Sequence, residues 1–292
     1  MNQPKRLAIV GGNSSIGRLL RARHMPGALA FVRGGGAEGA RQVARYHDIT
    51  AVDLAGIDTV INCAGAVAGT DEELRDANVA LPAALASACR DAGVGRLLHI
   101  SSFSVYGRAE AIDDATQPDP QSEYGRSKLA GDEALLAGEG NGLTCAVLRL
   151  PAILDPDGSN RKVAKMLHVW RRAGVWPVPK NDVRRSMISS AMTAATLADL
   201  ADSDAKGIVH AADKQPFSYA LARRVIEEES AKRARAFPLP KPAVALVGAI
   251  APSLHANLFA DSLLAERANF ASGYESDLEA TLRAMLGGRG ER

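Results

Sequence analysis

The chain has 292 residues, enough for one large or two modest domains around an apolar core. Its 35 basic side chains nearly balance 33 acidic ones, which excludes a strong bulk attraction to nucleic acid or to an anionic membrane. The cysteines, Cys63, Cys89 and Cys145, are far apart in apolar segments, which predicts buried, reduced thiols and neither a disulfide framework nor a metal site. The apolar runs are too short for a signal peptide or a transmembrane segment, so a cytoplasmic protein is expected.

The first half of the chain alternates between short apolar runs and helical patterns. Strands are predicted at Arg6–Val10, Ala28–Val32, Val43–Tyr46, Asp58–Cys63, Arg96–Ser101 and Leu143–Leu148. Helices are predicted at Ile16–Arg23, Glu72–Ala92 and Tyr124–Leu136. Buried strands that alternate with helices indicate an α/β protein with a doubly wound parallel sheet, connected by right-handed crossovers.

After Pro151 the regular alternation decays. Helices are predicted at Val163–Arg172 and Tyr219–Ser230, a returning strand at Gly207–Ala211, and a proline-bracketed apolar segment at Pro238–Pro252. We therefore expect a cofactor-binding domain over residues 1–151, with segments near 185–212 returning to it. A smaller lobe over residues 152–184 and 213–292 is expected to cover the mouth of the sheet and to bind substrate.

A glycine-bearing loop, Gly11-Gly12-Asn13-Ser14-Ser15-Ile16-Gly17, joins the first strand to the first helix. This context is what a dinucleotide-binding fingerprint requires, because the first-turn amides and the helix dipole attract a pyrophosphate. The middle glycine of the GxxGxxG pattern is replaced by serine, which is still small enough for close backbone approach. A plain turn is the alternative. The candidate cofactor contacts in this loop are Gly11, Ser14, Ser15, Ile16 and Gly17.

Cofactor preference is predicted from the residues that follow the next strands. Arg33 stands where an NAD enzyme usually has an acidic residue, and its guanidinium can pair with the 2′-phosphate of NADP(H). NADP(H) is therefore favoured, with NAD(H) as the alternative if Arg33 is only a solvated arginine. Asp48 can accept a hydrogen bond from the adenine amino group, or it can cap a turn. The remaining candidate cofactor contacts in these loops are Ile49, Ala64 and Gly65.

Tyr124 and Lys128 are four residues apart and share one face of a predicted helix. Reduction of a carbonyl needs a proton donor at the oxygen, and a nearby ammonium is expected to lower the phenol pKa from its ordinary value of about 10. Upstream, Ser102 ends a strand, where its hydroxyl can hydrogen-bond the substrate oxygen. Asn78 can help to position Lys128 through water. The alternatives are an exposed Tyr–Lys helix, turn-capping serines and an exposed asparagine.

Taken together, these motifs resemble the extended short-chain dehydrogenase/reductase superfamily, in its NAD-dependent epimerase/dehydratase branch. The matching stretches are IVGGNSSIGRLL, DTVINCAG, RDANVALPAALASACRDAGVGRLLHISSFSVYG, EYGRSKLAGDEALL and AVLRLPAIL. The resemblance implies a Rossmann-like doubly wound parallel sheet with a smaller C-terminal substrate lobe. It places the family's active serine at Ser102, its tyrosine at Tyr124 and its lysine at Lys128, and it makes Tyr124, Lys128 and Asn78 cofactor contacts.

The second half carries a fainter resemblance. The stretch GSNRKVAKMLHVWRRAGVWPVPKNDVRRSMIS is similar to the segment that holds a nucleotide-sugar diphosphate in this family, with Asn160 and Arg185 at positions that touch the nucleotide. LDPDG and SSAM depart from the family's usual VYGPG and VDDL. Sugar 4,6-dehydratases of the family carry an Asp-Glu pair where this chain has Phe103 and Ser104, so a dehydratase is disfavoured. Ser104 is instead a candidate substrate contact.

The resemblance implies an NADP(H)-dependent reductase of a 4-keto nucleotide sugar, of the kind used for surface polysaccharides. A C4 epimerase that retains NAD is the alternative. A non-catalytic dinucleotide-binding protein, structural or regulatory, is the alternative of another class. By the same resemblance, the helices over Glu72–Ala92 and Tyr124–Leu136 are expected to form a homodimer interface.

Overall fold

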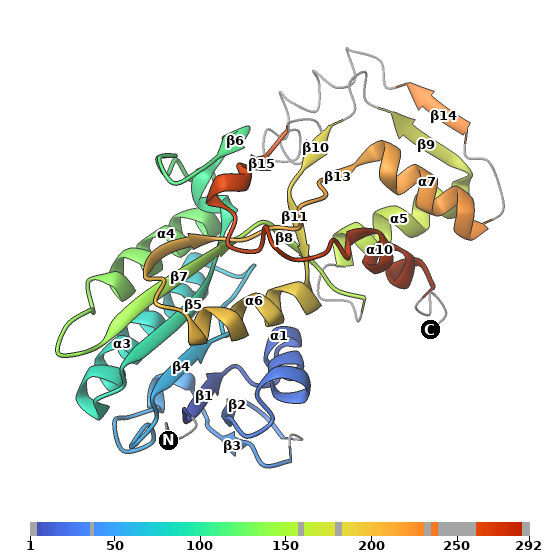
Figure 1. The fold of residues 1–292 in the computed structure, drawn as a ribbon. Helices are drawn as coiled ribbons and strands as arrows, with labels where there is room; N and C mark the ends of the chain where they lie inside the picture. Colours follow the sequence, from blue (N-terminus) through green and yellow to red (C-terminus); the bar gives the residue numbers. More distant parts are fainter. Residues whose placement is uncertain are drawn as a thin grey trace. The chain divides into compact units, whose positions relative to one another are not determined.

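The structure is a computed structural model, and its polypeptide folds into two compact units (Figure 1). It describes residues 5–35, 38–156, 161–178, 183–230, 235–238 and 261–287, with side chains omitted at 161–166, 175–178 and 235–238. The first unit comprises Met1–Gly107, Pro118–Leu150 and Ser190–His210. The second unit comprises Arg108–Gln117, Pro151–Ser189 and Ala211–Arg292.

A seven-stranded sheet forms the first unit, in the order β12-β7-β5-β4-β1-β2-β3. All neighbouring strands are parallel. The strands are β1 (Leu7–Val10), β2 (Leu29–Val32), β3 (Arg41–Gln42), β4 (Thr59–Asn62), β5 (Arg96–Ser102), β7 (Thr144–Leu150) and β12 (Gly207–His210). This arrangement confirms the predicted α/β, Rossmann-like class.

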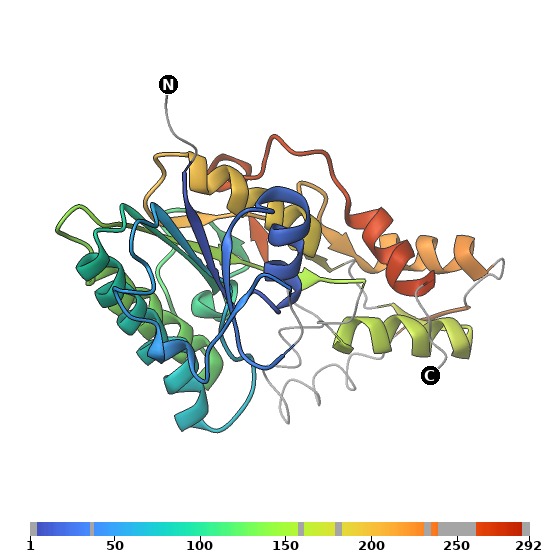
Figure 2. The same ribbon diagram turned by 90° about the horizontal axis from the view of Figure 1, so that it is seen from below.

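Helices cover both faces of this sheet (Figure 2). On one face lie α1 (Ser15–Leu19), the π-helical turn η1 (Leu20–His24) that continues it, and α6 (Ser190–Asp202). On the other face lie α2 (Asp71–Arg75), the π-helical turn η3 (Asp76–Ala80), α3 (Leu81–Ala92) and α4 (Glu123–Leu136). The core on this second side packs apolar residues of the strands against Leu85, Cys89 and Leu135. Because both sheet faces are covered, the central strands are mostly apolar, as their sequences indicated.

The third strand is shorter and earlier than predicted. Instead of a strand at Val43–Tyr46, the structure has β3 at Arg41–Gln42, followed by the 3₁₀ turn η2 (Tyr46–Asp48). The Asp48 carboxylate accepts the Arg45 amide at 3.0 Å and closes this turn. A side chain that bonds its own backbone competes with strand pairing, which explains the difference.

In the part of the second unit that the structure describes, short strand pairs pack with three helices. β8 (Ala152–Leu154) pairs with β11 (Met187–Ser189), β9 (Val175–Val178) with β14 (Arg235–Pro238), β10 (Arg184–Arg185) with β13 (Phe217–Ser218), and β6 (Ala111–Ile112) with β15 (Leu263–Leu264). The helices are α5 (Arg161–Ala173), α7 (Tyr219–Ser230) and α10 (Leu278–Gly287). Their core includes Leu154, Val225, Ile226, Leu278 and Leu282. The short 3₁₀ turns η4 (Phe103–Tyr106) and η5 (Glu266–Ala268) belong to the first and second units, respectively.

Two segments belong to a different unit from the one that the sequence predicted. The predicted return of residues near 185–212 to the main sheet is realised by 190–210, whereas β10 and β11 pair inside the second unit. Residues 108–117 lie in the second unit because β6 pairs with β15. Pro238 ends β14, and the rest of the Pro238–Pro252 segment lies outside the described residues. In the described part of the chain, no helix is both long and apolar enough to cross a membrane.

Candidate functional site

The order of the sheet reverses at β1, which has β2 on one side and β4 on the other. Parallel strands of this kind bind ligands at the carboxyl ends beside such a switch point. Val10 at the end of β1 is in register with Asn62 at the end of β4, so the loops that follow these strands lie side by side. The predicted cofactor loop therefore stands next to Ala64 and Gly65.

The loop after β1 approaches its neighbours too closely for side chains. Gly11 has φ +82°, and a Cβ there would lie 2.9 Å from the Ala64 amide nitrogen; a Cβ at Gly17 would overlap the Gly11 carbonyl. Ser14, in place of the middle glycine, caps α1 by accepting the Gly17 amide at 3.0 Å. The amides of Ser15 and Ile16 are left without an acceptor inside the helix. This bare backbone fits a dinucleotide pyrophosphate, to which Ile16 can offer only its amide because its side chain is buried.

The residues predicted to surround the adenosine differ in what they can offer. Arg33 is exposed, and its Cζ lies 5.1 Å from the centroid of the Tyr46 ring, a stacked cation–π arrangement. One oxygen of Asp48 is engaged in the η2 turn, as the turn-capping alternative predicted. The side chain of Ile49 is packed in the core, so it can contribute only backbone. Arg33 thus keeps an exposed guanidinium at the end of β2.

Asn78 is fully buried and joins the loop after β4 to α4. Its Oδ1 accepts the Ala66 amide at 3.0 Å, and its Nδ2 donates to the Ala66 carbonyl at 2.8 Å and to the Ser127 hydroxyl at 3.0 Å. A Cβ at Gly131 would overlap the Asn78 carbonyl, so this glycine lets α4 lie against η3. These hydrogen bonds lead to Ala66 and Ser127, so the expected positioning of Lys128 by Asn78 through water stays a prediction. The two hydrogen bonds between Asn78 and the Ala66 backbone fix the loop that carries Ala64 and Gly65.

Two predicted catalytic side chains, those of Ser102 and Tyr124, come together at the end of β5 and the start of α4. The Ser102 hydroxyl lies near Tyr124, and it donates to the Ser104 hydroxyl at 3.1 Å. Ser102 also accepts the Ser104 amide at 3.1 Å, so it caps η4 as well. A Cβ at Gly125 would lie 2.5 Å from the Ser104 carbonyl, so a glycine here lets α4 approach this turn. The side chains of Tyr124 and Ser102 are thereby held close to one another.

Burial raises the pKa of Tyr124 above its ordinary value; the nearby Ser102 hydroxyl lowers it in part, and Asp132 adds to the rise. The sequence predicted the opposite direction, through the ammonium of Lys128. In the structure the Lys128 ammonium lies against His99 and the Ile100 carbonyl instead. The cost of burying the charged phenolate therefore decides the direction of the Tyr124 pKa shift. A phenol that stays protonated at neutral pH is suited to donate a proton.

The side chain of Lys128 is held by residues of the sheet, on strand β5. Its Nζ lies 2.7 Å from the Ile100 carbonyl oxygen and 3.0 Å from Nε2 of His99. His99 Nδ1 in turn lies 3.0 Å from Nδ2 of Asn62. Lys128 is only 4% exposed, and burial lowers its pKa to about 8 although Asp132 opposes the shift. Desolvation and the neighbouring Lys128 hold the pKa of His99 well below its ordinary value, so this imidazole is neutral.

A second buried polar network lies one turn further along α4. Arg149 Nε donates to Asp132 Oδ2 at 2.9 Å, and its NH1 donates to the Tyr106 hydroxyl at 2.8 Å. The Tyr106 hydroxyl lies 2.6 Å from His210 Nε2. Tyr124, Lys128 and Asp132 follow one another at four-residue intervals, so these groups share one face of α4.

In the second unit, Arg185 and Arg184 occupy adjacent positions of β10. Arg184 is exposed and Arg185 partly buried, as expected for alternating residues of a strand. Burial lowers the pKa of Arg185, although Tyr219 and Asp261 oppose the shift. Asn160 lies outside the described residues. Of the two predicted nucleotide contacts, Arg185 is therefore the one that lies within the described residues.

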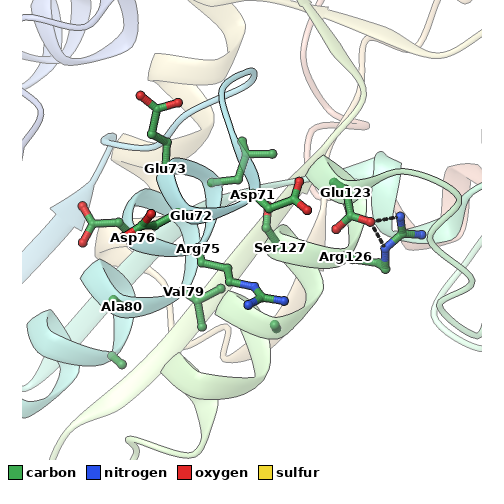
Figure 3. A pocket seen from close by; sticks show the side chains of 13 residues that line it. Asp71, Glu72, Glu73, Arg75, Asp76, Val79, Ala80, Glu123, Arg126 and Ser127 are labelled. Atoms are coloured by element: carbon green, nitrogen blue, oxygen red, sulfur yellow. Dashed lines mark hydrogen bonds and ion pairs between the residues drawn. The ribbon is translucent and has the colours of Figure 1, made fainter.

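A hollow of about 810 Å³ lies on the outer side of α2, η3 and α4 (Figure 3). Its charged lining comprises the carboxylates of Asp71, Glu72, Glu73, Asp76 and Glu123 and the guanidinium groups of Arg75 and Arg126. Neither Tyr124 nor Lys128 lines it, so it is separate from the predicted chemistry. A two-fold dimer through these helices would bring the acidic surface close to its own copy. The homodimer stays a prediction.

The sequence analysis missed the polar side chains beneath the site, namely Asn62, His99, Asp132 and Arg149. Three of them interrupt apolar strands, in VINC, LLHIS and LRL, and Asp132 follows Lys128 by one helical turn. A polar residue in a buried strand needs a partner, which was the available signal. Of the cysteines, Cys89 and Cys145 are buried and Cys63 is partly buried, and all three are free thiols.

Comparison with known proteins identifies similar sequences and folds. The sequence profile of the NAD dependent epimerase/dehydratase family matches residues 42–177. The chain is 38% identical over 165 residues to a dTDP-6-deoxy-L-talose 4-dehydrogenase (NAD(P)(+)) of Kitasatospora kifunensis, covering 50% of this chain and 52% of the relative. It is 32% identical over 207 residues to a dTDP-4-dehydrorhamnose reductase of Mycobacterium tuberculosis, covering 64% of this chain and 66% of the relative. The chain thus spans between half and two thirds of these relatives.

Solved structures share the fold at low sequence identity. MoeE5 in complex with UDP-glucose and NAD has a TM-score of 0.75 and 20% identity, with 97% of each chain covered. The Bordetella bronchiseptica enzyme WbmG in complex with NAD has a TM-score of 0.75 and 18% identity, with 98% of this chain and 94% of the other covered.

Proposed function

Because this chain belongs to the NAD-dependent epimerase/dehydratase family, we propose that it is an NADP(H)-dependent reductase of a 4-keto nucleotide sugar. The observation that carries the proposal is the placement of Ser102, at the carboxyl end of β5, near Tyr124 at the start of α4, with Lys128 one turn further along α4. The names of the two curated relatives, a 4-dehydrogenase and a 4-dehydro-sugar reductase, support redox chemistry at C4 of a dTDP-sugar.

The bound nicotinamide would supply the hydride for the carbonyl carbon. Gly11, Ser15, Ile16 and Gly17 would hold the pyrophosphate, and Arg33 the adenosine end. Tyr124 donates its phenolic proton to the carbonyl oxygen, and the Ser102 hydroxyl hydrogen-bonds that oxygen as charge develops on it. Lys128 supports Tyr124 from the adjacent turn.

The residues beside Ser102 support reduction over water elimination. The Phe103 ring is buried against Tyr106 and His210, with centroids 6.1 Å away in both cases. Ser104 offers a hydroxyl that accepts a hydrogen bond from Ser102. Neither side chain can act as a carboxylic acid–base pair.

Turnover assays separate the candidate activities. Net NADPH oxidation with dTDP-4-dehydrorhamnose is expected for a reductase. Interconversion of C4-epimeric nucleotide sugars without net cofactor consumption would instead identify the epimerase. Cofactor binding without either reaction, across a panel of nucleotide sugars, would identify a non-catalytic dinucleotide-binding protein.

Cofactor preference gives the first prediction. If Arg33 pairs with the 2′-phosphate, NADPH binds more tightly than NADH by roughly 1.5–3 kcal/mol, the value of a charged hydrogen bond. Arg33→Ala is expected to remove most of that difference, measured by calorimetric titration of both cofactors. Arg41→Ala is the matched control, since Arg41 also lies over an aromatic ring but pairs with Asp53. Equal affinity of the parent for both cofactors would refute the assignment.

Substrate binding gives the second prediction. A guanidinium makes paired hydrogen bonds to phosphate oxygens that lysine reproduces less well. Arg185→Ala is expected to weaken binding of dTDP and dTDP-sugars by roughly 1.5–3 kcal/mol without changing cofactor affinity. Arg184→Ala, on the exposed side of β10, is the control and is expected to bind normally. Undiminished dTDP and UDP binding by a folded Arg185→Ala protein would point to a smaller carbonyl substrate that lacks a nucleotide.

A further inference from the structure

The loop between β2 and β3, residues 33–40, follows the strand end at which Arg33 is expected to meet the cofactor. It is rich in glycine, and Gly34 and Gly39 have φ of +77° and +70°. A Cβ at Gly34, Gly35 or Gly39 would meet no other atom within 4 Å, so the described part of this loop is loosely surrounded. A loop with little packing depends on individual side chains to hold one conformation.

Arg21 reaches this loop from the π-helical turn η1. Its Nη2 donates to the Glu38 carbonyl at 2.8 Å. A Cβ at Gly12 would lie 3.5 Å from Cδ of Arg21 and 3.2 Å from Cγ1 of Val32, so the Arg21 stem passes beside Gly12 at the end of β2. The side chain thus runs along the loop predicted to hold the pyrophosphate and ends at the loop predicted to hold the adenosine.

The guanidinium of Arg21 keeps donors available for a ligand. It has five N–H groups, and the bond to Glu38 uses one of them. Among the residues that the structure describes, no carboxylate pairs with Arg21, whereas Arg41 at the start of β3 is paired with Asp53. Residues 15–24, which form α1 and η1, contain no acidic side chain. A partly buried cation without a counter-charge is suited to bind an anion.

We propose that Arg21 is a second specificity residue for the cofactor, which binds the 2′-phosphate of NADP(H) together with Arg33. This inference rests on the proposed function, in its preference for NADP(H). A phosphate monoester carries up to two negative charges at neutral pH, so one guanidinium balances only half of that charge. Arg33, stacked on Tyr46, and Arg21, bonded to Glu38, hold the two ends of the same loop. A phosphate bound by both groups also fixes the loop between them.

A purely structural role of Arg21 has a different consequence for binding. NADH and NADPH share the same adenosine, so loss of a contact that only holds the loop weakens both cofactors equally. Loss of a phosphate contact weakens NADPH alone. The ratio of the two affinities therefore separates the two roles, and its measurement needs neither substrate nor turnover.

Calorimetric titration of the cofactor-free protein measures that ratio. The ligands are NADPH and NADH, and also adenosine 2′,5′-bisphosphate and AMP, which differ only in the 2′-phosphate. Arg21→Ala is expected to weaken NADPH and adenosine 2′,5′-bisphosphate about tenfold or more, the size of a lost charged hydrogen bond, and to leave NADH and AMP nearly unchanged. Because both guanidinium groups hold one phosphate, Arg21→Ala is expected to have little further effect in an Arg33→Ala background.

Matched variants separate the charge of Arg21 from its hydrogen bond to the loop. Arg21→Gln keeps an N–H donor for the Glu38 carbonyl without the charge, and it is expected to behave like Arg21→Ala. Arg21→Lys keeps the charge, and it is expected to retain more of the preference for NADPH than either of these variants. Arg23→Ala removes one charge from an exposed position of the same turn and is expected to keep the parental ratio.

The outcomes distinguish failure of this inference from failure of the proposed function. Folded Arg21→Ala protein with the parental ratio of NADPH to NADH affinity would overturn the role of Arg21 alone, as would equal weakening of both cofactors. Parent protein that binds adenosine 2′,5′-bisphosphate no more tightly than AMP would refute the NADP(H) preference itself, and the role of Arg21 with it. If Arg21→Ala does not fold, equal ratios for Arg21→Lys and Arg21→Gln would contradict the inference.

Discussion

Turnover by Tyr124→Phe is expected to fall by a factor of about 10² or more, the usual size of lost general-acid catalysis. The phenol lies near Ser102, and burial raises its pKa, so it keeps its proton at neutral pH. Phenylalanine preserves the ring and its packing, so the fold and cofactor affinity should remain. Single-turnover rates with saturating NADPH and 4-keto nucleotide sugar measure the chemical step.

Tyr106→Phe is the matched control for this loss of a hydroxyl. The Tyr106 hydroxyl accepts from Arg149 and contacts His210 inside the protein, so its removal should lower the free energy of unfolding by roughly 1–3 kcal/mol. The chemical rate of the folded fraction should change little. A Tyr124→Phe protein that is folded and turns over at the parental rate would remove Tyr124 from the mechanism.

The largest effect on stability is expected for Asp132→Leu, at about 3–5 kcal/mol, because it leaves the buried Arg149 guanidinium without its counter-charge. The two side chains are 1% and 6% exposed. Burial raises the pKa of Asp132 even though Ser101 and Arg149 oppose the shift, so the ion pair itself is no strong source of stability. Denaturant unfolding monitored by circular dichroism measures the loss.

The double variant Asp132→Leu/Arg149→Leu should regain most of that stability, since neither charge is then buried. The double-mutant cycle therefore separates the cost of an orphaned charge from the value of the pair. A single variant as stable as the parent would show that Arg149 finds another partner or reaches water.

The sequence was most informative where one physical requirement dominated. Apolar strands such as Leu7–Val10 and Arg96–Ser102 must be buried on both faces, so their alternation with helices predicts the sheet. The four-residue spacing of Tyr124 and Lys128 predicts a shared helix face, and both lie on α4.

Elements set by competing local bonds were harder to predict. The turn closed by Asp48 replaced the end of the third strand, and α6 was missed because SAMTAATLADLAD buries nearly its whole circumference and lacks an amphipathic period. The direction of the Tyr124 pKa shift depends on burial and on where the Lys128 ammonium points. Spacing along α4 cannot reveal where Lys128 points, because the groups that hold it, His99 and Ile100, belong to the strand β5.

The most direct test of the proposed reduction is transfer of label at C4 of the sugar. The chain is incubated with dTDP-4-dehydrorhamnose and NADPH carrying deuterium on the transferred face of the nicotinamide. The expected product is a dTDP-6-deoxy sugar with deuterium at C4, formed in step with NADPH oxidation and much more slowly by Tyr124→Phe. Folded protein that binds both compounds yet transfers no deuterium to C4 would contradict the account.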